Sequence, residues 1–135
     1  MTDDDGPSEP IRFLSVEDVL LLHADTMAHE GGGEGVRDVG LLDAATIMPR
    51  QSFGGQYVHQ GLAAMAAAYL FHIVRGHPFI DGNKRVGALA ALVFLDVNGA
   101  TKLPRARDLE RATMAVAAGE LGKSELLQWF VDQCG

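Results

Sequence analysis

An unbroken apolar run from Val86 to Leu95 constrains the fold of this chain more than any other feature. A helix formed by this run would be apolar on every side, and such a helix is stable only when it is buried nearly all round. The pair Asn98-Gly99 is typical of a helix end, and Gly82-Asn83 lies where the helix would begin. The run therefore predicts a buried helix that starts near Asn83.

A second apolar segment lies upstream, where the chain turns helical from His59. Apolar residues recur along it at helical spacing, and its alanines allow close packing against a neighbouring helix. We expect it to be the central helix and to pack against the helix that starts at Asn83. His72 is expected to be a core histidine with satisfied hydrogen bonds. The apolar stretch Leu62–Val74 is too short to span a bilayer.

Cap residues and apolar periodicity predict four further helices. They are residues 16–30 after an N-cap at Ser15, residues 39–47 after an N-cap at Asp38, residues 108–118, and residues 125–133 after an N-cap at Ser124. The glycines and alternating polar and apolar residues of Arg50–Tyr57 suggest an extended segment or a small hairpin. The expected fold is therefore all-α, a bundle of about six helices with a short β-hairpin-like flap.

The chain of 135 residues is expected to form one domain over residues 13–135, after a disordered tail over residues 1–12. The formal net charge of −7 argues against non-specific binding to nucleic acid. Cys134 is the single cysteine, so no disulfide can form within the chain, and the acidic first residues are not expected to form a signal peptide. We expect a cytoplasmic protein without direct contact to nucleic acid or membrane.

The start of the predicted buried helix has the features of an anion site. Free backbone N–H groups and the positive end of the helix dipole at Gly82 and Asn83 favour a phosphate, and Gly82 lets a ligand approach closely. Lys84 and Arg85 add two full positive charges, and the Arg85 guanidinium can bind two phosphate oxygens at once. These residues, Gly82, Asn83, Lys84 and Arg85, are therefore the candidates for nucleotide binding.

Two residues just upstream supply further chemistry. His77 can accept a proton from a hydroxyl group near neutral pH, and Asp81 offers the hard oxygen ligand that Mg²⁺ bound to nucleotide phosphates requires. Arg75 lies next to them and is expected to face the bound phosphate or a protein partner. Each feature alone is usually structural, since a Lys-Arg pair is ordinarily a solvated face and a Gly-Asn pair a turn. Their combination at the start of a buried helix favours a functional site.

The segment His77–Arg85 resembles the motif of the Fic/Doc superfamily, His-x-Phe-x-Asp/Glu-Gly-Asn-Gly-Arg-x-x-Arg. It is most similar to the Doc (death on curing) branch, the toxins of bacterial toxin–antitoxin pairs. Lys84 stands where Fic enzymes carry a second glycine, and Ala88 stands where they carry the second arginine. Gly82 keeps the Fic residue, where the best-known Doc toxin has alanine. The resemblance extends from about Phe13 to Phe130.

The resemblance implies an activity. Fic enzymes generally transfer AMP from ATP to a protein hydroxyl, whereas the Doc branch moves the γ-phosphate of ATP to a threonine of elongation factor Tu and so stops translation. By position, His77 would be the catalytic base, Asp81 would hold Mg²⁺, and Asn83, Lys84 and Arg85 would hold the phosphates. A small, partly disordered antitoxin would be the partner. Two alternatives remain. One is AMP transfer, which Gly82 favours, and the other is a catalytically silent antitoxin-binding module.

Two other segments acquire an interpretation from the family. The region Arg50–Tyr57 corresponds to a flap that aligns the target peptide by strand pairing, so Arg50 and Gln51 are expected to contact the target or the antitoxin. A plain surface loop explains the same residues equally well. The segment Thr26–Gly31 matches a self-inhibitory Ser/Thr-x-x-x-Glu-Gly signature of some Fic enzymes. Its simpler interpretation is the end of a helix, and Doc toxins usually receive their inhibitor from the antitoxin.

Overall fold

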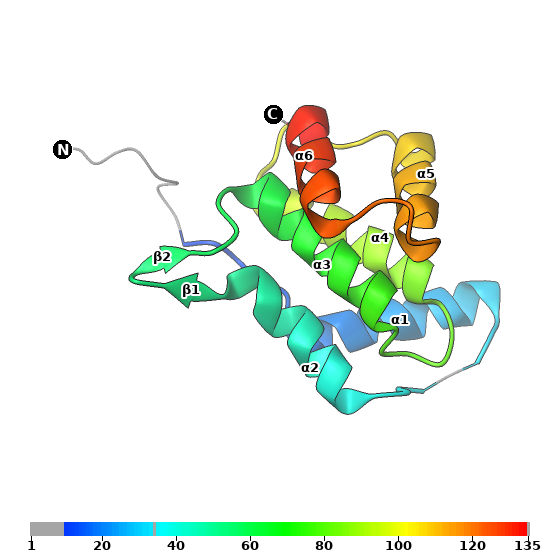
Figure 1. The fold of residues 1–135 in the computed structure, drawn as a ribbon. Coiled ribbons are helices and arrows are strands. Elements are labelled where there is room, and N and C mark those ends of the chain that lie inside the picture. The colour runs from blue at the N-terminus through cyan, green and yellow to red at the C-terminus, as the bar shows by residue number, and fades with distance from the viewer. Residues whose placement is uncertain (1–9, 34, 135) are drawn as a thin grey trace.

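The structure is a computed structural model that describes residues 10–33 and 35–134. Within these ranges the chain forms six α-helices, one short 3-10 helix and one two-stranded antiparallel sheet (Figure 1). In chain order the elements are α1 Val16–Glu30, α2 Val39–Ile47, η1 Met48–Arg50, β1 Ser52–Phe53, β2 Gln56–Tyr57, α3 Leu62–Gly76, α4 Asn83–Val97, α5 Ala106–Ala117 and α6 Lys123–Cys134. The predicted all-α class, with about six helices and a small hairpin, is confirmed.

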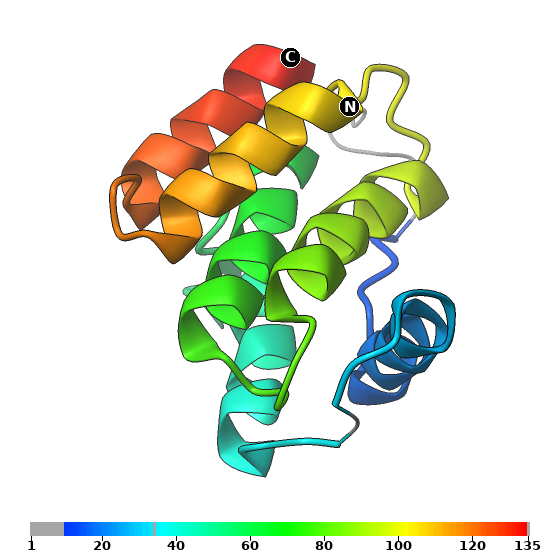
Figure 2. The same ribbon diagram turned by 90° about the vertical axis from the view of Figure 1, so that its right-hand side faces the viewer.

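Helix α3 is the centre of the bundle, as predicted. Helices α2, α4, α5 and α6 all pack against it, and α1 packs on α4 (Figures 1 and 2). Every residue from Ala64 to Leu70 is buried, because α3 has a neighbour on nearly every side. No helix in the described ranges is long and apolar enough to cross a membrane.

Helix α4 is buried as its composition predicts, and residues 86–95 include no exposed position. Its contact with α3 is close because Gly87 has no side chain. A Cβ atom at Gly87 would lie 2.8 Å from Val74 Cγ2 and 3.3 Å from the Leu70 carbonyl oxygen. The glycine therefore sets the spacing of the two central helices.

The helix ends follow the predicted caps, with one exception. Ser15 and Asp18 form a complete capping box at the start of α1, and the Asp38 side chain accepts from the Leu41 N–H at the start of α2. Ser124 does not cap α6, because the helix already begins at Lys123. There the Glu125 carboxylate accepts a hydrogen bond of 2.8 Å from the Gly122 N–H and satisfies the helix start from within the first turn.

The predicted hairpin forms between β1 and β2, with Ser52 opposite Tyr57 and Phe53 opposite Gln56. Gly54 and Gly55 at its tip have φ values of 60° and 82°. Two consecutive positive φ angles are typical of the tight turn that joins neighbouring antiparallel strands. The two-residue strands are exposed, so the hairpin projects from the bundle.

The segment before α1 is bound to the core through one buried side chain. The Tyr69 hydroxyl accepts from the Leu14 N–H at 2.8 Å and donates to the Leu14 carbonyl at 3.2 Å. Burial raises the pKa of Tyr69 to about 12, so the hydroxyl keeps its proton at physiological pH. Ile11 also packs on the core. Residues 1–9 of the predicted tail lie outside the described residues.

His72 differs from the prediction of a satisfied core histidine. Its Nε2 atom is buried without a hydrogen-bond partner among the described residues, and the same holds for Nδ1 of His59. Burial lowers the pKa of His72 to about 4, and the nearby charges of Lys123 and His59 act in the same direction. The prediction was wrong because the polar group that would have satisfied the ring had to come from elsewhere in the chain, and none of the described residues provides it.

We expect Tyr69→Phe to lower the free energy of unfolding by about 1–3 kcal/mol, because the buried N–H and carbonyl of Leu14 both lose their partner. Urea denaturation followed by circular dichroism measures this loss. Tyr57→Phe is the matched control, because Tyr57 is 40 % exposed in the hairpin. Equal stability of the two variants would contradict the role assigned to the Tyr69 hydroxyl.

We expect His72 to make stability fall as the pH drops from about 6.5 to about 4, because the unfolded chain binds a proton that the folded chain resists. Above this window the contribution is fully present. The slope for one proton is at most about 1.4 kcal/mol per pH unit, and lower for a half-buried ring. Urea denaturation at several pH values should give a shallower slope for His72→Leu than for wild type. Parallel curves would refute the assignment, and His29→Leu, at an exposed histidine, serves as control.

Candidate active site

The motif His77–Arg85 joins the end of α3 to the start of α4 (Figure 1). His77 is exposed and caps α3, with its N–H donating to the Ile73 carbonyl at 3.1 Å. Its main chain is left-handed, with φ 54° and ψ 53°. Among the described residues it is the only non-glycine with a positive φ. This conformation costs about 1–2 kcal/mol, so neighbouring contacts must hold it.

A segment outside the motif supplies some of these contacts. Residues 35–38 run antiparallel to residues 78–80, with a β-bridge between Val36 and Phe79 and a hydrogen bond of 3.2 Å from the Ile80 N–H to the Gly35 carbonyl. The Arg37 guanidinium donates to the carbonyl oxygens at the end of α3. The sequence analysis missed Arg37, since nothing local indicates a partner forty positions away.

Phe79 is fully buried and anchors the motif in the core. Its backbone is held by the Asn83 side chain: Oδ1 accepts from the Phe79 N–H at 3.0 Å and Nδ2 donates to the Phe79 carbonyl at 2.9 Å. Asn83 is only 4 % exposed. The structure therefore places the Asn83 amide in the loop scaffold, and only its backbone N–H is available for the predicted phosphate binding.

His23 of α1 is a second residue of this scaffold. Its ring stacks on Phe79 with 3.9 Å between centroids and 6° between planes. Its Nε2–H donates to the Asp81 carbonyl oxygen at 2.9 Å, because a carbonyl can only accept. Nothing in the local sequence indicates this role for His23, and the structure shows it buried beneath the motif.

Asp81 is exposed at the loop surface. Its carboxylate oxygens accept from the Gly82 N–H at 2.8 Å and from the Gly33 N–H at 3.3 Å. In residues 10–33 and 35–134 no group of three or more His, Cys, Asp or Glu side chains could hold a metal ion. A single carboxylate still fits Mg²⁺ bound together with nucleotide phosphates, where substrate oxygens and water supply the other ligands.

Lys84 and Arg85 are exposed in the first turn of α4, where the helix N–H groups point outward. The Arg85 Nε atom lies 3.0 Å from Glu30 Oε2, and both side chains are about half exposed. Such a pair is weak in water, so a phosphate can compete for the guanidinium. Glu30 belongs to the self-inhibitory signature noted above, whereas the Thr26 hydroxyl donates to the Leu22 carbonyl within α1.

The structure does not bring the other predicted contact residues to the motif. Figure 1 shows the hairpin of β1 and β2 away from the α3–α4 loop, toward the start of α3. Arg50 is the last residue of η1, and Gln51 joins η1 to β1. The Arg50 guanidinium lies 5.9 Å from the ring centroid of Phe13. Arg75 Nη1 donates to the Val116 carbonyl at 3.4 Å, so its guanidinium faces the end of α5. A role for these residues in binding a target or antitoxin stays a prediction.

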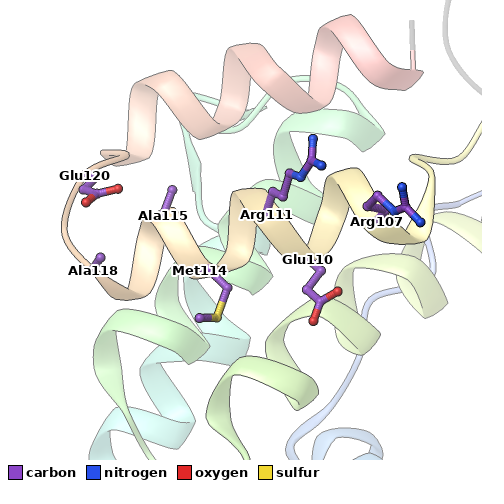
Figure 3. A pocket seen from close by; sticks show the side chains of 7 residues that line it. All are labelled: Arg107, Glu110, Arg111, Met114, Ala115, Ala118 and Glu120. Carbon is purple, nitrogen blue, oxygen red and sulfur yellow. The ribbon is translucent and has the colours of Figure 1, made fainter.

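A hollow on the surface of α5 is lined by no residue of the motif (Figure 3). Its lining residues are Arg107, Glu110, Arg111, Met114, Ala115, Ala118 and Glu120. Two arginines and two glutamates leave it without net charge, so it does not attract a triphosphate. The exposed motif at the α3–α4 junction is the better candidate.

The sequence that forms this junction and most of the bundle matches a known family. The model of the Fic/DOC family matches residues 13–95, and the chain therefore belongs to this family. It is 42% identical over 100 residues to Toxin Doc of Mycolicibacterium smegmatis (strain ATCC 700084 / mc(2)155), which covers 74% of each chain. It is 34% identical over 117 residues to Protein kinase doc of Escherichia phage P1, covering 86% of this chain and 90% of that protein. Both relatives place the chain on the Doc branch.

We expect Gly82→Ala to destabilise the protein by about 1–2 kcal/mol, because the φ of 84° at Gly82 disfavours any side chain. A Cβ there would also lie 2.5 Å from Met27 Cε, the flexible end of a side chain that can swing aside. Gly99→Ala is the matched control, with φ 80° and open space around it. Chemical denaturation should give similar losses. A much larger loss at Gly82 would show that Met27 cannot move.

Proposed function

We propose that this chain is the toxin of a toxin–antitoxin pair and transfers the γ-phosphate of ATP to a hydroxyl group of a translation factor, elongation factor Tu. One observation carries the proposal. Within the motif, Pro78, Phe79 and Asn83 are buried, whereas the four side chains suited to phosphoryl transfer are exposed along the α3–α4 loop and the first turn of α4: His77, Asp81, Lys84 and Arg85. The similarity to a protein named as a kinase supports the same activity.

The proposed reaction needs little beyond positioning and charge compensation. His77 takes the proton from the acceptor hydroxyl, whose oxygen forms a bond to the γ-phosphorus. The bond from that phosphorus to the β–γ bridging oxygen breaks, and ADP leaves. Lys84, Arg85 and the N-terminal end of α4 stabilise the charge on the phosphate oxygens. Mg²⁺ held at Asp81 would neutralise further phosphate charge when bound.

The structure bears on both alternatives. Gly82 is the residue that favours AMP transfer, but its positive φ explains a glycine at this position without reference to the reaction. Ala88 leaves the chain without the second arginine of the Fic motif. Against a silent antitoxin-binding module, the exposure of His77 and Asp81 offers both groups to a ligand. An antitoxin as partner and a cytoplasmic location, where translation factors are found, belong to the same proposal.

The direct test is incubation of the purified chain with elongation factor Tu and ATP labelled at either the α- or the γ-phosphate. We expect label on the factor from γ-labelled ATP only. Label from α-labelled ATP would favour AMP transfer instead. No transfer, together with no nucleotide or Mg²⁺ binding by calorimetry, would favour the silent binding module.

We expect His77→Ala to abolish both the labelling and growth arrest on expression, because the acceptor hydroxyl loses its base. The typical contribution of a general base is about 10²–10⁴-fold in rate. The fold should survive, because the His77 side chain is exposed, and circular dichroism checks this. His29→Ala removes another exposed histidine and should retain full activity. Persistent phosphoryl transfer by His77→Ala would disprove the assigned base.

A further inference from the structure

We propose that Arg37 is a positioning residue, which holds the main chain of His77 in its left-handed conformation and thereby directs the imidazole toward the acceptor hydroxyl. The inference rests on the proposed function, because it concerns the base of that reaction. It concerns a residue outside the motif, on the segment between α1 and α2.

The conformation of His77 needs an explanation. A left-handed residue just after a helix is ordinarily glycine, which adopts φ 54° without steric cost. A histidine at this position does not end a helix better than glycine does. The reason for a histidine here must therefore lie in its side chain. The direction of the Cα–Cβ bond depends on φ and ψ, and a return to the right-handed region would swing the imidazole away from the loop. Whatever stabilises the left-handed state therefore also aims the ring.

Arg37 is the side chain that contacts this main chain. Its Nε donates to the His77 carbonyl at 2.7 Å and its Nη2 donates to the Gly76 carbonyl at 3.0 Å. The planar guanidinium presents these two donors in a fixed fork, so the two carbonyl oxygens must keep one relative orientation. Both bonds involve a charged donor at the negative end of α3, where a cation is favourable.

Arg37 is itself held in place by its own backbone. The N–H groups of Arg37 and Asp38 both donate to the Pro78 carbonyl, at 2.7 Å and 3.1 Å. The Asp38 side chain accepts from the Leu41 N–H and anchors the segment to the start of α2. Arg37 therefore contacts the carbonyls of three consecutive residues, Gly76, His77 and Pro78. This geometry is more specific than general stabilisation of a helix end requires.

The test compares wild type with Arg37→Ala, Arg37→Lys and the control Arg111→Ala, which removes a guanidinium from α5 (Figure 3). Phosphoryl transfer to elongation factor Tu gives kcat and the KM for ATP. For Arg37→Ala we expect kcat to fall about 10- to 100-fold with KM within about twofold, because orientation changes while the phosphate site stays. Arg37→Lys keeps the charge without the fork and should recover part of kcat. Arg111→Ala should match wild type.

A second measurement separates this inference from the proposed function. In nuclear magnetic resonance spectra of histidine-labelled protein, the signal that disappears in His77→Ala belongs to His77. We expect this signal to shift in Arg37→Ala and to stay unchanged in Arg111→Ala. Circular dichroism shows whether each variant is folded. Unchanged kcat, a rise in KM alone, or a superimposable His77 signal in folded Arg37→Ala would overturn the role of Arg37. If wild type transfers no phosphate, the proposed function fails, and the spectra still decide on Arg37.

Discussion

The close packing of α3 against α4 is the contact on which the rest of the structure depends. Gly87 lets the helices approach until a Cβ atom would lie within 2.8 Å of Val74. This packing holds the end of α3 and the start of α4 at the two sides of one short loop. The loop therefore lies between a negative and a positive helix end. Arg37 donates to carbonyls at the negative end, and the positive end begins at Asn83, next to the exposed Lys84 and Arg85.

In the motif, buried side chains hold the loop in place, and exposed side chains carry the charged and titratable groups. Phe79 enters the core, Asn83 pairs with the Phe79 backbone, and His23 supports both the ring and the Asp81 carbonyl. These contacts fix the loop without using the groups that carry charge or a proton. His77 and Asp81 are consequently presented on a rigid frame. Such preorganisation suits a reaction in which placing the reactants is most of the catalysis.

Much of the fold could be predicted from the sequence because its signals are local. The apolar runs, the caps Ser15 and Asp38, and the glycines after α1 and α4 act within a few residues, and the observed helices agree with them. The error at Ser124 is also local: the hydrogen bond between Gly122 and Glu125 starts the helix at Lys123, two residues before the start that a cap at Ser124 predicts. The prediction that His72 has satisfied hydrogen bonds was wrong, because these bonds depend on residues distant in the sequence.

The sequence by itself determined the number and order of the helices, several of their ends, and the residue types that the segment His77–Arg85 offers. Only the tertiary structure decided which of those side chains face solvent, that Asn83 serves the scaffold, and that Arg37 and His23 join the site. It also decided that the hairpin lies away from the α3–α4 loop (Figure 1). The reason is physical: helix signals act between near neighbours, whereas these contacts join residues that meet only after the helices have packed.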